Sequence, residues 1–312
     1  MRADLLPGVT VFERGWLSSN NILLHGSDGE HATLVDTGYA SHAEQTLALV
    51  RRALRPGQSL ARIVNTHLHS DHCGGNAALA RAFGARIVIP PGHADAVAAW
   101  DEDQLTYRLT SQRCDRFSAE AVLRPGESFA VGGRHWQALA APGHDPHSLI
   151  LFDRQEGVLI SADALWENGF GVVFPELDGH PGDSGGFDDV AAVLALIESL
   201  DVRLVIPGHG APFTDVAGAL QRSRSRLAAF RADPVRHARH GIKALTKYHL
   251  LEVGSEPLAA LHAWFTTTPI VAQVWQRLGR PDGAAAAWGE RLVAELVAQG
   301  VVVLRDGVVH NE

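Results

Sequence analysis

The sequence has little cysteine and no long apolar run. Its 312 residues include two cysteines, Cys73 and Cys114, which are too few for a disulfide framework and fit a reducing compartment. No apolar stretch approaches the roughly 20 residues that a membrane-spanning helix needs. The first residues, MRADLLPGVTVFERGW, lack the basic-then-apolar pattern of a signal peptide, so a cytoplasmic location is expected. A disulfide-rich scaffold and a membrane protein are therefore excluded as classes.

Composition and length predict a folded chain with more than one domain. Apolar residues make up 46% of the sequence and charged residues 20%, which is ordinary for a globular protein and argues against a mainly disordered one. A chain of 312 residues is longer than one typical domain, so about two domains are expected. The pattern changes from alternating strands and helices to mainly helices after about residue 215, so the domains are expected at residues 1–220 and 221–312.

The net charge of −8 is unevenly distributed. Residues 221–312 carry 12 basic and 8 acidic side chains, so the negative excess lies in residues 1–220. The basic side chains concentrate between Arg222 and Lys247. A nucleic-acid surface is one interpretation of this run. A solvated linker helix is favoured, because binding to a phosphate backbone requires a clearly positive surface.

Residues 1–220 alternate short apolar runs with helical periodicity. Helices are expected over 41–54 and 74–84, and strands over 20–26, 31–38, 61–67, 85–92, 128–133, 134–141, 147–153, 157–163 and 203–208. Strands interleaved with helices predict a layered α/β domain whose sheet faces are covered by helices. A helical stretch over about 91–124 interrupts this rhythm and is interpreted as an insertion.

The chain after about residue 215 is mainly helical. Amphipathic helices are expected over 256–265, 269–279 and 283–300. Two apolar runs then flank Asp306-Gly307, and a DG dipeptide in that setting predicts a β-hairpin. Helices followed by a hairpin are the order of a winged helix, so a winged-helix-like domain is predicted. The same helices are candidates for a homodimer interface.

A dense histidine motif follows the strand expected over 61–67. It consists of His67, His69, Asp71 and His72 in the string HLHSDH, followed by CGG. Such a string rarely arises by chance. Because a strand end delivers the whole loop to one point, these side chains can converge without long loop closures. The motif therefore predicts a metal site.

Three further ligand-type residues each follow an apolar strand. They are His144 in APGHDPHS, Asp163 in LISADAL and His209 in VIPGHG. We expect them at the same edge of the sheet as the histidine motif. Imidazole and carboxylate bind zinc-like ions, and a bridging carboxylate holds two ions roughly 3.5–4 Å apart. Together with the motif, these residues predict a two-metal site.

This order of residues resembles the metallo-β-lactamase superfamily of hydrolases over about residues 15–215. The resemblance implies a four-layer αββα sandwich. It assigns His67, His69 and His144 to the first metal ion, Asp71, His72 and His209 to the second, and Asp163 to both. Zinc is the expected metal, with iron or manganese as alternatives, because ligand type discriminates poorly among them.

The implied reaction is hydrolysis. Two metal ions lower the pKa of a bridging water, which attacks as hydroxide, and they stabilise the oxyanion that forms. Asp71, which orients the hydroxide, and Asp163, which bridges the ions, are the predicted catalytic residues. Asp36 in LVDTG matches an acidic turn beneath the metal loop of the superfamily, with an ordinary turn aspartate as the alternative. His147 is expected to support the site from behind or to face the substrate, with a strand-edge histidine bonded to the backbone as the alternative.

Sequence differences from known members of the superfamily limit the range of possible substrates. Thioesterases similar to glyoxalase II carry a lysine soon after the bridging aspartate, but residues 164–171 have none, and lactonases of the signal-degrading type have a tyrosine where Trp166 stands. Trp166, Phe170 and Phe174, with Tyr107 in the insertion, are expected to line an apolar substrate pocket, with core packing or loop anchoring as the alternative for each ring. Such a pocket favours a small carboxylic ester or thioester. A metal-dependent single-strand ribonuclease is the alternative, and a lactonase is a further one.

Overall fold

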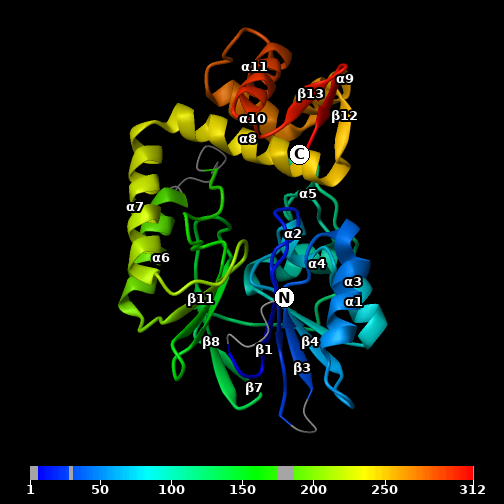
Figure 1. The fold of residues 1–312 in the computed structure, drawn as a ribbon, viewed down its shortest axis with the longest axis vertical. Coiled ribbons are helices and arrows are strands. Elements are labelled where there is room, and N and C mark those ends of the chain that lie inside the picture. The colour runs from blue at the N-terminus through cyan, green and yellow to red at the C-terminus, as the bar shows by residue number, and fades with distance from the viewer. Residues whose placement is uncertain (1–5, 28–30, 175–185, 312) are drawn as a thin grey trace.

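Two β-sheets form the centre of the molecule. The computed structural model describes residues 6–27, 31–174 and 186–311 (Figure 1). The first sheet has the order β1-β2-β3-β4-β5-β6, with β1 (Val9–Phe12), β2 (Asn21–Leu24), β3 (Ala32–Val35), β4 (Leu60–Val64), β5 (Arg86–Ile89) and β6 (Ala121–Val122). The second has the order β11-β10-β9-β8-β7, with β7 (Ser128–Val131), β8 (Arg134–Ala140), β9 (Leu149–Asp153), β10 (Val158–Ala162) and β11 (Leu204–Pro207). The strands predicted from the apolar runs are confirmed.

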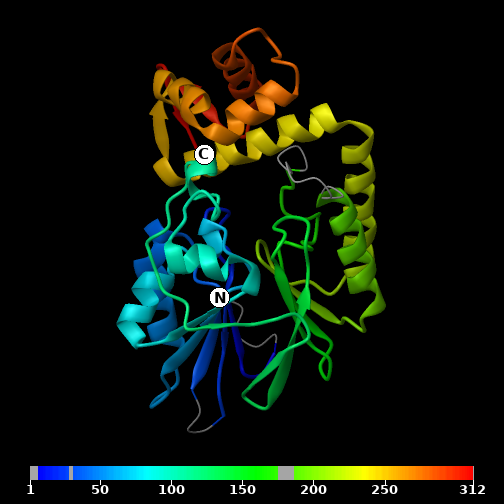
Figure 2. The same ribbon diagram turned by 180° about the vertical axis from the view of Figure 1, so that it is seen from behind.

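Helices cover the outer face of each sheet. Those associated with the first sheet are η1 (Ala40–His42), α1 (Ala43–Ala53), α2 (Ser70–Cys73), α3 (Asn76–Phe83), η2 (Pro91–His93), α4 (Ala94–Ala99) and α5 (Tyr107–Thr110). The second sheet is covered by α6 (Gly186–Ser199) and α7 (Val216–Ala232), as Figure 2 shows from behind. The helices predicted over 41–54 and 74–84 are therefore confirmed as α1 and α3.

Alternate residues of the strands fill separate apolar layers. Leu34 and Ile63 pack in the core that includes α1 and α3, whereas the next residues, Val35 and Val64, pack in the core between the two sheets. A third core joins the second sheet to α6 and α7. Three apolar layers separating four layers of structure confirm the predicted αββα sandwich.

Strand direction determines where the functional loops lie. The pairs β3–β4 and β4–β5 are parallel in the first sheet, and β10–β11 is parallel in the second. The loop after β4 therefore lies at one edge of the first sheet, and the loops after β10 and β11 lie together at one edge of the second. These are the loops that carry the histidine motif, Asp163 and His209. In Figure 1 they lie beneath α8 (Pro234–Val253), which crosses above both sheets.

The segment 91–124 is part of the sandwich. Its residues Val97, Tyr107 and Phe117 are buried in the core beneath α1 and α3, and its end forms β6, which pairs in parallel with β5. The prediction of an inserted helical segment is thus confirmed only for η2, α4 and α5. The short strand was missed because two paired residues give no periodicity to detect.

The C-terminal region is helical and has its own core. It contains α8, β12 (Ser255–Pro257), α9 (Leu258–Thr267), α10 (Pro269–Arg277), α11 (Ala285–Ala298), β13 (Val303–Arg305) and β14 (Val308–His310). The hairpin predicted at Asp306-Gly307 is confirmed, since β13 and β14 pair antiparallel around it. The domain boundary expected after residue 220 lies within α7, whose Leu220 and Leu227 pack with the sandwich. Across the described ranges, no helix has the length and hydropathy needed to cross a membrane.

Candidate metal centre

The histidine motif forms a tight loop between β4 and α3. His67 and His72 are fully buried, and His69 and Asp71 are half-buried. Gly74 allows this packing, because a Cβ at this position would lie 2.5 Å from the backbone nitrogen of Ala40. Two backbone segments therefore meet where only glycine fits.

The structure brings all seven predicted ligands together in two groups. The first contains His67, His69 and His144, and the second contains Asp71, His72, Asp163 and His209. Within each group, one ligand atom from every residue lies within 4.8 Å of the others. This division is the one that the superfamily resemblance implied. The first group offers three imidazoles and the second offers two imidazoles and two carboxylates, which are donors that a zinc-like ion binds.

Asp163 faces both groups. Its Oδ2 lies 3.3 Å from Nε2 of His144, and its Oδ1 lies 3.4 Å from Nε2 of His72. Asp163 is 4% exposed and directly follows β10, whose pairing with β11 shifts register between Ile160 and Ala162. A single carboxylate with one oxygen toward each group is the arrangement of a bridging ligand.

The second ring nitrogen of most histidine ligands is hydrogen-bonded behind the site. Nδ1 of His72 bonds to Asp36 at 2.8 Å, Nδ1 of His67 lies 3.1 Å from Oγ1 of Thr66, and Nδ1 of His144 contacts the Val172 carbonyl. Such bonds fix ring orientation and leave the other nitrogen toward a metal. The buried Nε2 atoms of His67 and His72 have no hydrogen-bond partner among the residues placed by the structure. Orphaned nitrogens of this kind fit a metal ion, which would satisfy them.

Asp36 is itself held in place by the start of the metal loop. Its Oδ1 accepts from the backbone N–H of Thr66 at 2.9 Å, and its Oδ2 accepts from the Thr66 hydroxyl at 2.8 Å. Asp36 is buried and has φ of 56°, a left-handed conformation that aspartate tolerates better than most residues. The predicted acidic turn thus contacts both the loop backbone and the His72 ligand.

The pKa shifts of the ligands favour binding of a cation at the site. Burial and neighbouring imidazoles hold the pKa of His67 well below its usual range, and burial with His144 lowers the pKa of His69 to about 4. Burial opposes charge on His72, but surrounding carboxylates, Asp163 foremost, raise its pKa well above the usual value. Burial alone would raise the pKa of Asp163, yet imidazoles led by His72 hold it well below. Neutral imidazoles and ionised carboxylates bind divalent metals, so His67, His69 and Asp163 are held in the binding form, whereas His72 would release a proton when an ion binds.

Comparison with known families decides the identity of this site. The family model for the metallo-beta-lactamase superfamily matches residues 14–209, which include every ligand above. The chain belongs to the metallo-beta-lactamase superfamily. With its two groups of metal ligands, it is a metal-dependent hydrolase.

Similar proteins include curated enzymes and a solved structure. The chain is 30% identical over 291 residues to the hydroxyacylglutathione hydrolase of Anaeromyxobacter dehalogenans (strain 2CP-C), covering 91% of this chain and 96% of that protein. It is 30% identical over 153 residues to the enzyme of the same name from Rhodopseudomonas palustris (strain BisB18), spanning 50% of that relative's length. A beta-lactamase domain protein from Burkholderia ambifaria has a TM-score of 0.59 at 21% identity, over 99% of this chain and 93% of that one. This last likeness shows a shared fold that extends through the C-terminal region.

His147 does not lie behind the metal ligands, where it was expected. Its exposed ring packs edge-on against His93, with ring centroids 4.5 Å apart. Asp145, which sequence reasoning missed, is the closer support: it is buried, and its Oδ2 lies 3.9 Å from Nε2 of His69. His147 contributes through its backbone N–H, which donates to Asp145 at 2.7 Å. The sequence signal was the Asp-Pro pair directly after His144.

Only some of the residues predicted to line the substrate pocket adjoin the metal ligands. Trp166 does, since its Nε1 donates to Asp163 at 3.2 Å. Tyr107 is 2% exposed and hydrogen-bonds the Leu68 carbonyl, so it supports the metal loop from within the core. Phe170 is 4% exposed in the core under α6 and α7. Tyr107 and Phe170 are thus corrected from pocket residues to core residues, because buried rings cannot contact a substrate.

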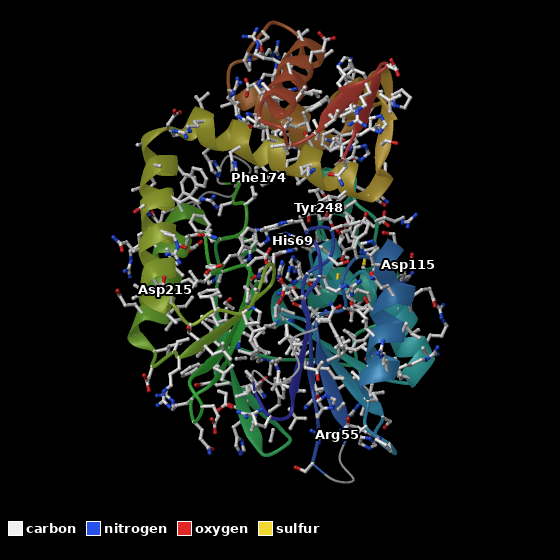
Figure 3. All side chains as sticks on the ribbon, in the orientation of Figure 1. Arg55, His69, Asp115, Phe174, Asp215 and Tyr248 are labelled. Carbon is white, nitrogen blue, oxygen red and sulfur yellow. The ribbon has the colours of Figure 1, made fainter. Side chains whose placement is uncertain are left out.

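Phe174 marks the junction with the C-terminal region. Its ring packs against α8, where a Cβ on Gly241 would lie 2.7 Å from it. Figure 3 shows Phe174 near α8 at one side of the site, and His69 and Tyr248 together toward the other. Phe174 therefore anchors α8, and residues 175–183 of the expected pocket loop lie outside the described residues.

Trp16 and Tyr248 also adjoin the site and were not predicted. Trp16 stacks on His209, and the Tyr248 hydroxyl donates to the Leu17 carbonyl at 3.2 Å. Burial raises the pKa of Tyr248 well above its usual value, and the nearby Asp71 carboxylate raises it further. Both residues are far from the ligands in sequence, and no local pattern predicts their approach.

The basic run between Arg222 and Lys247 is largely neutralised. Its ion pairs join Arg222 to Asp215, Arg224 to Glu198, Arg231 to Asp188, and both Arg239 and Lys243 to Glu295. Lys247 donates to the Val301 carbonyl at 2.8 Å. Paired basic side chains along α7 and α8 favour the linker-helix interpretation over a nucleic-acid surface.

Proposed function

We propose that the protein hydrolyses a small carboxylic thioester or ester at the metal centre. The observation that carries the proposal is the near full-length similarity to a hydroxyacylglutathione hydrolase, together with the two ligand groups joined by Asp163. That relative's name describes cleavage of a thioester between an acyl group and glutathione. Since residues 164–171 lack the lysine of the glutathione-binding pattern, the thiol half of this protein's substrate is expected to differ.

The residues of the site have distinct tasks. When bound, two divalent ions would supply a hydroxide nucleophile at neutral pH and stabilise negative charge on the attacked carbonyl. Asp163 would hold both ions, and Asp71 would hold one ion and orient the nucleophile. Asp36, Thr66 and Asp145 keep the imidazoles in the orientation that this chemistry needs.

The cysteine of the motif is not a competing nucleophile. Cys73 is fully buried, and its Sγ lies 3.1 Å from the hydroxyl of Tyr107. Burial, reinforced by the neighbouring Cys114, raises the pKa of the Cys73 thiol well above its usual value. A buried neutral thiol is unreactive, so the reaction depends on the metal ligands.

Zinc is the metal that we propose, because histidine-rich sites with carboxylates suit it well. The metal content of the purified protein and its affinities for zinc, iron and manganese, measured together, distinguish these ions.

We also propose that the C-terminal region is winged-helix-like, since its small sheet has the order β12-β14-β13 and ends in a hairpin. Most basic side chains of the run are paired with acidic ones in the part of the chain that the structure describes, so the ribonuclease alternative is not favoured.

A thioester panel tests the proposed reaction. Hydroxyacyl thioesters of glutathione and of smaller thiols are offered to the metal-loaded protein, with a labelled single-stranded RNA and a lactone as rival substrates. Thioester cleavage that is lost on chelation and in Asp163→Asn supports the proposal. Cleavage of only the RNA or only the lactone, with the same controls, would overturn it.

A further inference from the structure

Trp16 presents a large apolar surface to solvent beside the metal ligands. It lies in the β1–β2 loop, residues 13–20, and is 56% exposed, more than the other exposed large apolar residues of the described chain. An exposed indole forgoes the favourable free energy that burial of its ring would give. An aromatic ring left open to solvent at a catalytic centre indicates a binding surface.

The Trp16 ring is held in one orientation. It stacks on the imidazole of His209, with centroids 5.3 Å apart and planes 9° from parallel. Trp166 meets Trp16 edge-on at 5.3 Å and 70°, and meets His209 edge-on at 5.4 Å. We call these three rings the aromatic wall. Although Trp16 contacts both His209 and Trp166, the residue remains 56% exposed, so much of its surface is open to a ligand.

The backbone beneath Trp16 is anchored on two sides. The Asn20 N–H donates to the Gly208 carbonyl at 2.6 Å, which ties the loop to the segment that carries His209. The Tyr248 hydroxyl donates to the Leu17 carbonyl at 3.2 Å, which ties the loop to α8. A pre-organised aromatic surface binds a ring with little loss of conformational entropy.

The aromatic wall adjoins the reacting groups. Trp166 Nε1 donates to Oδ1 of Asp163 at 3.2 Å, and Nε2 of His209 lies 3.1 Å from Oδ2 of Asp71. A ring stacked on Trp16 would therefore lie close to a carbonyl held between the two ligand groups. Both indoles are uncharged, so the surface suits a planar apolar group rather than an ionic one.

We propose that Trp16 and Trp166 bind an aromatic ring of the substrate, so that the enzyme prefers aryl or arylalkyl thioesters and esters. This inference rests on the proposed thioester or ester hydrolysis. Planar rings gain stacked or edge-to-face contacts with indoles that a saturated ring of similar size does not. Planarity, rather than size or hydrophobicity, is therefore the property that the aromatic wall selects.

A binding experiment tests the inference without turnover. The metal-loaded protein is titrated by calorimetry with phenylacetate and with cyclohexylacetate, which share a carboxylate and differ in ring planarity. Wild-type protein is expected to bind phenylacetate about five- to tenfold more tightly than cyclohexylacetate. This ratio should fall to about one in Trp16→Ala and be largely kept in Trp16→Phe. Leu304→Ala, at an exposed apolar residue on β13, is the matched control that keeps the ratio.

A kinetic experiment separates this inference from the proposed function. The kcat/KM values for phenylacetyl and cyclohexylacetyl thioesters of one thiol are compared in wild type and Trp16→Ala. If wild type cleaves both with the ratio seen in Trp16→Ala, the inference is wrong and the proposed function stands. If wild type cleaves neither but cleaves a hydroxyacyl thioester of the panel, the inference is wrong and the proposed function stands. If wild type cleaves no thioester or ester at all, both fail. Reduced metal content in Trp16→Ala with an unchanged ratio would assign Trp16 to supporting His209 instead and overturn the inference.

Discussion

Asp36 accepts a hydrogen bond from Nδ1 of His72 at 2.8 Å, with both side chains almost fully buried. The bond fixes the imidazole so that Nε2 faces Asp163 and Asp71. A residue at the end of β3 thus controls a ligand that follows β4. The order of the parallel strands makes this contact possible.

Replacing Asp36 with alanine should weaken metal binding about ten- to hundredfold, because His72 loses the partner that orients it. Competition against a chromogenic chelator measures the affinity. Asp36→Asn keeps an acceptor oxygen and should lose less. Wild-type affinity in Asp36→Ala would show that the metal loop orients His72 without this bond.

Gly74→Ala should displace the metal loop. The added Cβ would lie 2.5 Å from the Ala40 nitrogen and from the Ser70 carbonyl oxygen, and neither backbone segment can move without disturbing the ligands. We expect a loss of metal content together with a fall of about 2–4 kcal/mol in the free energy of unfolding. Gly15→Ala is the control, since a Cβ there meets nothing within 4 Å. Equal metal content and stability in the two variants would contradict the packing argument.

Tyr39→Phe should loosen the C-terminal region without removing a ligand. The Tyr39 hydroxyl donates to Glu252 on α8 at 2.7 Å and accepts from the Arg113 N–H at 3.2 Å. Loss of these bonds should lower the free energy of unfolding by about 1–3 kcal/mol, as followed by urea denaturation. Metal content should stay at the wild-type value. A variant as stable as wild type would mean that α8 is held chiefly by Phe174 and its other apolar contacts.

The combined substitution of Arg222, Arg224 and Arg226 with alanine should leave RNA affinity unchanged. Arg222 and Arg224 are already paired with acidic side chains, so they offer little free positive charge to a phosphate backbone. Fluorescence anisotropy with a labelled single strand, at two salt concentrations, measures binding. Marked weakening in the variant would restore the ribonuclease interpretation.

Much of the fold and of the ligand set follows from local sequence patterns. The runs before Thr66, Asp163 and His209 are short, apolar and β-branched, so their strands could be predicted, and each ligand follows its strand by one to a few residues. The αββα layering followed from the alternation of strands and helices. These patterns depend on near neighbours, which the sequence displays directly.

The remaining parts of the site depend on contacts between distant segments. Trp16 reaches His209 across 193 residues of sequence, and Tyr248 reaches Leu17 from another region of the fold. Phe170 follows the bridging ligand as closely as a pocket residue would, yet it turns into the core. Sequence adjacency to a ligand does not show which way a side chain points, and only tertiary packing determines it.

Titration of the metal-free protein with zinc tests the central claim most directly. Thioester hydrolysis and bound zinc are measured in the same samples as metal is added. The two ligand groups predict that hydrolysis requires metal and reaches its maximum near two ions per chain, and that Asp163→Asn lacks this maximum. Full hydrolysis by the chelated protein, or tight binding of a single ion with full activity, would contradict the account.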